Sequence, residues 1–202
     1  MAVRMGRSAW HALRYFLYLD RAETQTTNAE RKCLAQYASG RRRIVEIGVF
    51  EGVGTRLLAK CVAPGGRVYG IDPFVGGRLG VSWGKFIAQA EIRKAKRPGT
   101  VELVRTWSWD AAKLLEGTFD MIFVDGDHSL EGIRRDWLDW SPRLAEGGIV
   151  ALHDTRVPAH NPHIGELGSF KFFESYIRHD PRFDICEQVD SLSVLRRNGK
   201  RE

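Results

Sequence analysis

The sequence predicts a single α/β domain with a mostly parallel sheet and helices on both faces. One observation is that short apolar runs alternate with segments of helical periodicity from about residue 44 to residue 152. This alternation is typical of parallel strands joined by helices. The other is a pair of strand-like runs near the C-terminus, separated only by Asp190 and Ser191. Such a short connection predicts an antiparallel hairpin, which we expect at the edge of the sheet.

The first 40 residues are expected to form a helical cap segment, and residues 41–197 the sheet-forming domain. Trp10, Leu13 and Leu17 recur at helical spacing and predict an amphipathic helix. Its aromatic content leads us to expect a homodimer. The chain has 202 residues, 43% of them hydrophobic, which is enough for one substantial core.

The other elements are predicted from apolar periodicity and from glycine, proline and capping residues at their ends. Helices are expected at about residues 27–39, 57–62, 83–96, 109–115, 130–140 and 170–177, and strands at 44–47, 67–71, 101–104, 119–124, 148–152, 183–189 and 192–196.

Composition limits the classes of function. The formal net charge is +6 and the pI is about 9.4, but the basic residues are scattered, so nucleic acid is a disfavoured partner. No apolar run approaches 18 residues, so no membrane span is expected. Cys33, Cys61 and Cys186 form no CxxC pair, and we expect a reducing, cytoplasmic location. Cys61 and Cys186 are predicted to be core thiols.

A glycine-rich loop, residues 48–54, follows the first predicted strand and opens a helix. Its spacing is GxxxGxG, not the GxGxxG of dinucleotide-binding sites. Glu46, beside the loop, would repel a pyrophosphate and attract an amine. Asp72, after the second strand, is placed to bind a ribose diol. The alternative is that the glycines serve only the turn, but together these residues favour an adenosyl ligand with a positive charge.

Carboxylates and imidazoles follow two other strands. Asp125, Asp127 and His128 come after the strand ending at Val124, and the pair His153–Asp154 follows the next strand. The carboxyl ends of parallel strands meet at one crevice, where ligands bind. We therefore expect these side chains to converge, and an enzyme is the first hypothesis.

The chain resembles the class I S-adenosylmethionine-dependent methyltransferases. The likeness covers about residues 30–197 and points to the small-molecule branch that includes macrocin O-methyltransferase and cephalosporin hydroxylase-like proteins. It implies a Rossmann-like sheet of seven strands with an antiparallel C-terminal hairpin. The motifs that carry it are EIGVFEGVGT (46–55), GIDPF (70–74), FVDGDHSLEGIRRD (123–136) and LAEGGIVALHDT (144–155).

The resemblance implies which residues would bind the cofactor, S-adenosylmethionine. It assigns the amino-acid end to Glu46, Gly48, Gly52 and Thr55, the ribose to Asp72, the adenine to Ser108 and Trp109, and a further contact to Asp125.

The resemblance also implies catalytic roles. Asp125, His153 and Asp154 match the positions that hold magnesium in metal-using relatives, and His128 matches a general base, with Asp125 beside it in the catalytic set. Those relatives have Glu-Asp where this chain has His153–Asp154. Because magnesium prefers oxygen ligands, the histidine weakens the case for Mg²⁺ and admits manganese, iron or zinc. Two roles stay open for His153: metal ligand, or buried histidine that holds Asp154.

Other residues have structural explanations at least as good as functional ones. Asp127 is expected to cap the helix that follows Ser129. Phe74 and Trp83 are candidates for contacting an apolar acceptor. His160 and His163 are expected to face the substrate or solvent, and the aromatic stripe of Trp137, Trp140, Phe170 and Phe173 is expected in the core.

The leading hypothesis is a methyltransferase for a hydroxyl of a small molecule, with a sugar-bearing or phenolic acceptor. An RNA methyltransferase is one alternative, supported only by the basic pI. A non-catalytic module that binds the adenosyl cofactor is another, with the N-terminal helix as its docking element. A nicotinamide dehydrogenase ranks last because the loop spacing and Glu46 both argue against it.

Overall fold

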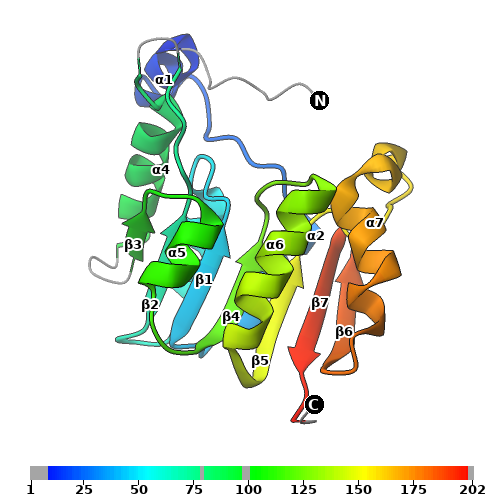
Figure 1. Ribbon diagram of the computed structural model, residues 1–202. Helices are drawn as coiled ribbons and strands as arrows, with labels where there is room; N and C mark the ends of the chain where they lie inside the picture. Colours follow the sequence, from blue (N-terminus) through cyan, green and yellow to red (C-terminus); the bar gives the residue numbers. More distant parts are fainter. Residues whose placement is uncertain (1–8, 78–79, 97–100, 200–202) are drawn as a thin grey trace.

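The computed structural model describes residues 9–77, 80–96 and 101–199. Its sheet has seven strands in the order β3-β2-β1-β4-β5-β7-β6 (Figure 1). The first five pair in parallel, and β7 is antiparallel to both β5 and β6. The predicted fold class is confirmed. The strands are β1 Arg43–Ile47, β2 Arg67–Ile71, β3 Val101–Val104, β4 Phe119–Val124, β5 Leu144–Leu152, β6 Phe183–Val189 and β7 Leu192–Arg197.

Helices cover both faces of the sheet, with α5, α6 and α7 on the near face in Figure 1 and α2 behind it. The helices are α1 Ala9–Phe16, α2 Asn28–Ala38, α3 Val53–Cys61, α4 Trp83–Arg93, α5 Ser108–Leu114, α6 Leu130–Trp140 and α7 Gly168–Ser175, with 3₁₀ turns at Ser141–Arg143, Pro162–Glu166 and Ile177–His179.

Strand alternation divides the core into two layers. Val45 points to the layer formed with α6 and α7, where Trp137 and Phe173 are buried. Ile44 points to the opposite layer, against Leu34 of α2 and other residues of α2 and α3. Because both faces are covered, the central strands are apolar at nearly every position. The aromatic stripe is core as expected, with Trp137, Trp140 and Phe173 buried and Phe170 half-buried.

The C-terminal hairpin corrects the prediction for two cysteines. The register shifts between Ile185 and Glu187, and β6 is the outermost strand. Cys186 stands at that irregularity, without a register partner on β7 in the described structure, and is exposed. Cys61 is half-buried, and only Cys33 of the three is a buried thiol.

The predicted N-terminal helix is present, but its buried face is not the predicted one. Ala12 and Tyr15 pack against Ile87 of α4, and the Tyr15 hydroxyl donates to Glu91 at 2.7 Å. The face with Trp10 and its neighbours is open to solvent, since Trp10 is 64% exposed. Among the described residues, no helix is long and apolar enough to cross a membrane.

The strand register brings the polar segments to one level. Ile47 of β1 pairs with both Ile71 of β2 and Val124 of β4, and Val124 in turn pairs with Leu152 of β5. The residues after these four positions therefore leave the sheet side by side. The polar segments that the sequence predicted to meet therefore lie together at the carboxyl ends of these strands.

Candidate active site

The loop after β1 is held between the neighbouring strands by backbone hydrogen bonds. Gly48 N–H donates to Ile71 O at 2.9 Å, and Asp125 N–H donates to Ile47 O at 2.8 Å. Gly48 has φ +92°, and a Cβ there would overlap the backbone of Asp125. Glycine at this position is thus required by close packing as well as by the positive φ.

Asp72 ties the same loop to the end of β2. Its Oδ2 accepts from the N–H groups of Val49 at 3.1 Å and Phe50 at 3.0 Å, and its Oδ1 accepts from Phe74 N–H at 2.7 Å. Burial raises the pKa of Asp72, against the opposing effect of these three bonds. The carboxylate that the sequence assigned to a ribose therefore already organises the loop.

Glu46 is buried at the end of β1 and is held by α3. Thr55, in the first turn of α3, donates its hydroxyl to the Glu46 carboxyl. Burial is the main cause that raises the pKa of Glu46 to about 8, with Asp125 and Asp72 adding to it. Near neutral pH this carboxyl keeps its proton unless a positive charge is brought close to it.

Ser108 and Trp109, the candidate adenine contacts, begin α5. Ser108 donates its hydroxyl to Asp136 of α6, and the Trp109 ring stacks on Trp107 with centroids 5.0 Å apart. Asp136 is buried, and burial raises its pKa to about 6. Sequence reasoning gave Asp136 no role, although a carboxylate on the apolar face of a predicted helix, next to Trp137, was a visible signal.

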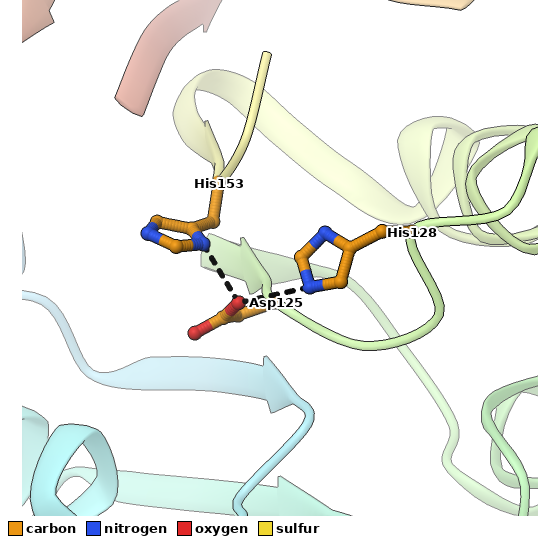
Figure 2. Close-up of side chains that lie close together, drawn as sticks. All are labelled: Asp125, His128 and His153. Carbon is orange, nitrogen blue, oxygen red and sulfur yellow. Dashed lines mark ion pairs between the residues drawn. The ribbon is translucent and has the colours of Figure 1, made fainter. Parts of the chain in front are cut away.

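Two imidazoles and two carboxylates meet beyond β4 and β5. Nδ1 of His153 lies 2.9 Å from Oδ1 of Asp125 and 3.5 Å from Oδ1 of Asp154. The ring nitrogens of His128 lie 3.6 Å from Asp125 Oδ1 and 3.5 Å from Asp154 Oδ2. Figure 2 shows both imidazoles turned toward Asp125 from different segments of the chain. Four of the five residues that the sequence predicted to converge therefore do so, whereas the fifth, Asp127, is hydrogen-bonded to Ser129 instead.

His153 is the most buried member, with its side chain 3% exposed. Burial lowers the pKa of His153, but the surrounding carboxylates of Asp125, Glu30 and Asp154 outweigh it and raise the pKa well above its usual value. Within the described part of the chain, both ring nitrogens of His153 and Oδ1 of Asp125 are buried without an aligned hydrogen bond. Although His153 and Asp125 lie close together, these atoms therefore remain available for further hydrogen bonds or for binding an ion.

This site lies inside a region that matches a known family. Residues 45–155, more than half of the chain, match the model of a family described as a methyltransferase domain. The chain belongs to this methyltransferase family. The match contains all four sequence motifs and ends at Thr155, directly after Asp154.

Curated relatives share moderate identity. Tricin synthase 1 of Oryza sativa subsp. japonica is 24% identical over 180 residues, covering 79% of this chain and 68% of that protein. Catechol O-methyltransferase of Mycobacterium tuberculosis is 29% identical over 123 residues, which cover 60% of this chain and 51% of that protein. An uncharacterised protein of Sinorhizobium fredii is 26% identical over 125 residues, 59% of this chain but 14% of that protein. The methyltransferase chain thus spans less than two thirds of the length of two of these relatives.

Solved structures share the fold across nearly the whole methyltransferase chain. An O-methyltransferase from Bacillus cereus in complex with SAH has a TM-score of 0.66 at 20% identity, covering 96% of this chain and 94% of that one. The O-methyltransferase TomG from Streptomyces achromogenes in complex with SAM has a TM-score of 0.66 at 19% identity, and the likeness covers 98% of this chain and 93% of that one.

The cluster has a further buried neighbour outside the family match, Glu30 of α2. Its Oε2 lies 3.5 Å from Nε2 of His153. Glu30 is fully buried, yet the facing imidazole, Thr27 N–H and Ser191 outweigh burial and lower its pKa to about 2. The sequence signal was the capping box Thr27-x-x-Glu30, which is present in α2. It indicates a helix start and nothing about His153.

The residues present fit a divalent cation. Asp125, His128 and His153 each offer one ligand atom, and these atoms lie within 4.8 Å of one another. Ligands at adjacent corners of an octahedral site are about 3 Å apart, so the observed spacing of 2.9–3.6 Å is suitable. Such an ion would bind the buried atoms of His153 and Asp125 that have no aligned hydrogen bond in the described structure. With imidazoles in the set, manganese, iron or zinc suits it better than magnesium.

Other candidate residues turn out to be structural. Asp127 accepts from the backbone N–H and the hydroxyl of Ser129, each at 2.9 Å, and so holds the N-cap of α6 as expected. Phe74 is buried against Val49 and Ala88, so its role as an acceptor contact is wrong. Trp83 is half-buried and packs beside α1. His160 and His163 are exposed.

Proposed function

We propose that this methyltransferase uses S-adenosylmethionine to methylate a hydroxyl group of a small, sugar-bearing or phenolic molecule. The observation that carries this proposal is the adjacency of two polar groups at one sheet edge. Glu46 lies near the end of β1 and Asp72 directly after β2, and the His–carboxylate cluster follows β4 and β5. The relatives named for tricin and catechol chemistry support an oxygen acceptor of small size.

The bound cofactor supplies a methyl group on a positively charged sulfonium. Glu46 would ionise in response to that cation and to the ammonium of the amino-acid end. Gly48, Gly52 and Thr55 shape the loop for the same end, and Asp72 would extend a free lone pair to the ribose. Ser108 and Trp109 would contact the adenine, and Asp125 would make a further contact with the cofactor.

The acceptor hydroxyl must lose its proton and be aligned with the methyl group. His128 is the proposed general base, because a neutral imidazole accepts protons near pH 7. It is also the most open member of the cluster, at 24% exposure, so it can pass the proton to solvent. Asp125 and Asp154 would orient the hydroxyl.

A divalent cation, held by Asp125, His153 and Asp154, is part of the proposal. When bound, such an ion lowers the pKa of a coordinated hydroxyl and fixes its direction. His128 would then remain outside the ligand set, because an imidazole nitrogen bound to a metal cannot also accept the proton.

We also propose roles for the N-terminal segment and the surface. Residues 1–40 would cap the cofactor side of the domain. Within this segment, residues 1–8 lie outside the part of the chain that the structure describes. The exposed apolar side chains of Leu13 in α1, at 48%, and of Leu17 in the turn after it, at 58%, would meet a second copy. Leu17→Lys should then convert a dimer to a monomer in light scattering, and a monomeric wild type would rule this interface out. The buried thiol of Cys33 and the exposed thiol of Cys186 support a cytoplasmic location.

The deciding experiment combines binding and turnover. Calorimetry should show binding of S-adenosylmethionine and of its demethylated product, and labelled cofactor should transfer methyl to catechols, phenols or sugar hydroxyls. Binding without transfer to any such acceptor would favour the non-catalytic module. Transfer to RNA, with affinity that falls steeply as salt rises, would favour the RNA alternative.

A further inference from the structure

His153 lies between two carboxylates, one at each ring nitrogen. Nδ1 faces Asp125 at 2.9 Å, and Nε2 faces Glu30 at 3.5 Å. The longer contact is an electrostatic one, and a shift of about 0.5 Å would turn it into a hydrogen bond. Glu30 comes from α2, 123 positions earlier in the chain than His153, and lies outside the matched residues 45–155.

The Glu30 carboxylate is fixed by the groups around it. Its Oε1 accepts from the backbone N–H of Ser191 at 2.8 Å and from the Ser191 hydroxyl at 2.7 Å. Its Oε2 accepts from Thr27 N–H at 2.7 Å, which leaves one lone pair of that oxygen for His153. The helix start of α2 and the β6–β7 turn therefore hold this carboxylate in place against the imidazole.

An ionised carboxylate only accepts hydrogen bonds. It therefore keeps a proton on Nε2 of His153, so that Nδ1 is the ring nitrogen that can give up its proton to bind a metal ion. Nδ1 faces Oδ1 of Asp125 at 2.9 Å, and the two atoms have no aligned hydrogen bond in the described structure. A divalent cation could take the place of a proton between these two atoms.

We propose that Glu30 is a positioning residue that fixes the imidazole of His153, so that Nδ1 joins Asp125 as a ligand of a divalent cation that accepts nitrogen. This rests on the proposed function of the same site and extends it to the class of metal. A carboxylate behind a metal-binding histidine orients the ring and increases its basicity. The N-terminal segment thus contributes to the site from outside the family's matched region.

The test uses Co²⁺ alone as the probe, titrated into the full chain and followed by visible absorption. Wild type should bind one Co²⁺, and His153→Ala should abolish the signal. Glu30→Gln replaces one carboxylate oxygen by an NH₂ donor, which would face Nε2 and favour the opposite tautomer. We expect its Co²⁺ affinity to fall about 10- to 100-fold. In ¹⁵N spectra of the metal-free protein, recorded at a pH at which His153 has released one of its two ring protons, the remaining proton should move from Nε2 to Nδ1.

Thr27→Ala is the matched control for a merely structural effect. It removes the N-cap hydroxyl, which accepts from Glu30 N–H and donates to Asp190, but keeps the backbone N–H that the Glu30 carboxylate accepts. This variant should lower the melting temperature and leave the Co²⁺ affinity unchanged.

The outcomes separate the two proposals. Unchanged Co²⁺ affinity in Glu30→Gln, an equal loss in Thr27→Ala, or no Co²⁺ binding by wild type would each overturn the role of Glu30. Calorimetry with S-adenosylhomocysteine on the same samples tests the proposed function separately. Cofactor binding without Co²⁺ binding would leave that function standing, and the reverse result would remove it.

Discussion

The two halves of the site differ in how their polar atoms are used. On the β1–β2 side, Asp72 accepts three backbone hydrogen bonds and Glu46 accepts one from Thr55. On the β4–β5 side, His153 and Asp125 approach to 2.9 Å and leave buried atoms without an aligned hydrogen bond. The first half is satisfied by the chain itself, and the second is not.

This difference separates the half of the site that organises the loop from the half that has polar atoms available for a ligand or a reaction. Buried polar atoms are normally satisfied, so a group of orphaned atoms in one place indicates a missing ligand or a catalytic role. The satisfied half fixes the loop so that a cofactor meets a preformed surface. The unsatisfied half is the one to which the proposed function assigns the cation and the acceptor hydroxyl.

The largest expected effect is on turnover in the unsatisfied half. His128→Ala should lower kcat by about 10²- to 10⁴-fold, because proton removal loses its general base, while cofactor affinity changes little. Single-turnover methyl transfer and calorimetry measure the two quantities. His163→Ala, an exposed histidine of a nearby loop, is the control. An unchanged kcat in His128→Ala would make His128 a ligand or a bystander.

The next effect is on cofactor affinity in the satisfied half. Asp72→Ala should weaken binding of S-adenosylhomocysteine roughly 10- to 100-fold, because it removes a charged hydrogen-bond acceptor. Asp72→Asn keeps one carbonyl oxygen, so its affinity should lie between the affinities of the wild type and of Asp72→Ala. Asp110→Ala, on the surface of α5, should have no effect on calorimetry. Equal affinity in all three would refute the ribose role.

Backbone packing of the loop gives a stability effect. Gly48→Ala places a Cβ into the backbone of Asp125 at φ +92°, whereas Gly40→Ala, at φ +78°, meets nothing within 4 Å. We expect about 1 kcal/mol for the strained φ alone and several-fold more when the overlap is added. Urea unfolding of both variants measures this. If the two cost the same, the contact between loop and β4 is not tight.

The smallest effect concerns a proton on Glu46. Its pKa of about 8 lies above the ordinary value of about 4.3. The folded chain keeps this proton between those pH values while the unfolded chain releases it. The stability contribution is therefore fully present below about pH 4.3 and falls as pH rises toward 8.

A cation bound beside Glu46 would favour its ionised form, so cofactor binding at pH 7 should release up to about one proton. Calorimetry in buffers of different ionisation enthalpy should detect this release. Glu46→Gln should lose it. A binding enthalpy independent of buffer in wild type would contradict the assignment of Glu46.

The sheet was predictable because its signals are local. Apolar runs, turn residues and the two-residue connection at Asp190–Ser191 indicate strands and their direction without reference to distant contacts. The same local signals did not predict which side chains of a given helix or strand are buried. Trp10 and Leu13 were predicted to form the apolar face of an amphipathic helix, and they are exposed, because α1 packs on α4 through Tyr15 and Ala12. Cys186 was misplaced because it stands at the register shift of β6, without a register partner on β7 in the described structure.

The sequence by itself determined that Asp125, His128, His153 and Asp154 would converge, since parallel strands present their carboxyl ends at one level. It also indicated the glycine loop and its two acidic partners. Only the tertiary structure decided that Asp72 is already bonded to the loop, that Asp136 holds Ser108, and that Glu30 faces His153. Such contacts join segments far apart in the chain, and their formation depends on how helices pack over the sheet, which local periodicity does not encode.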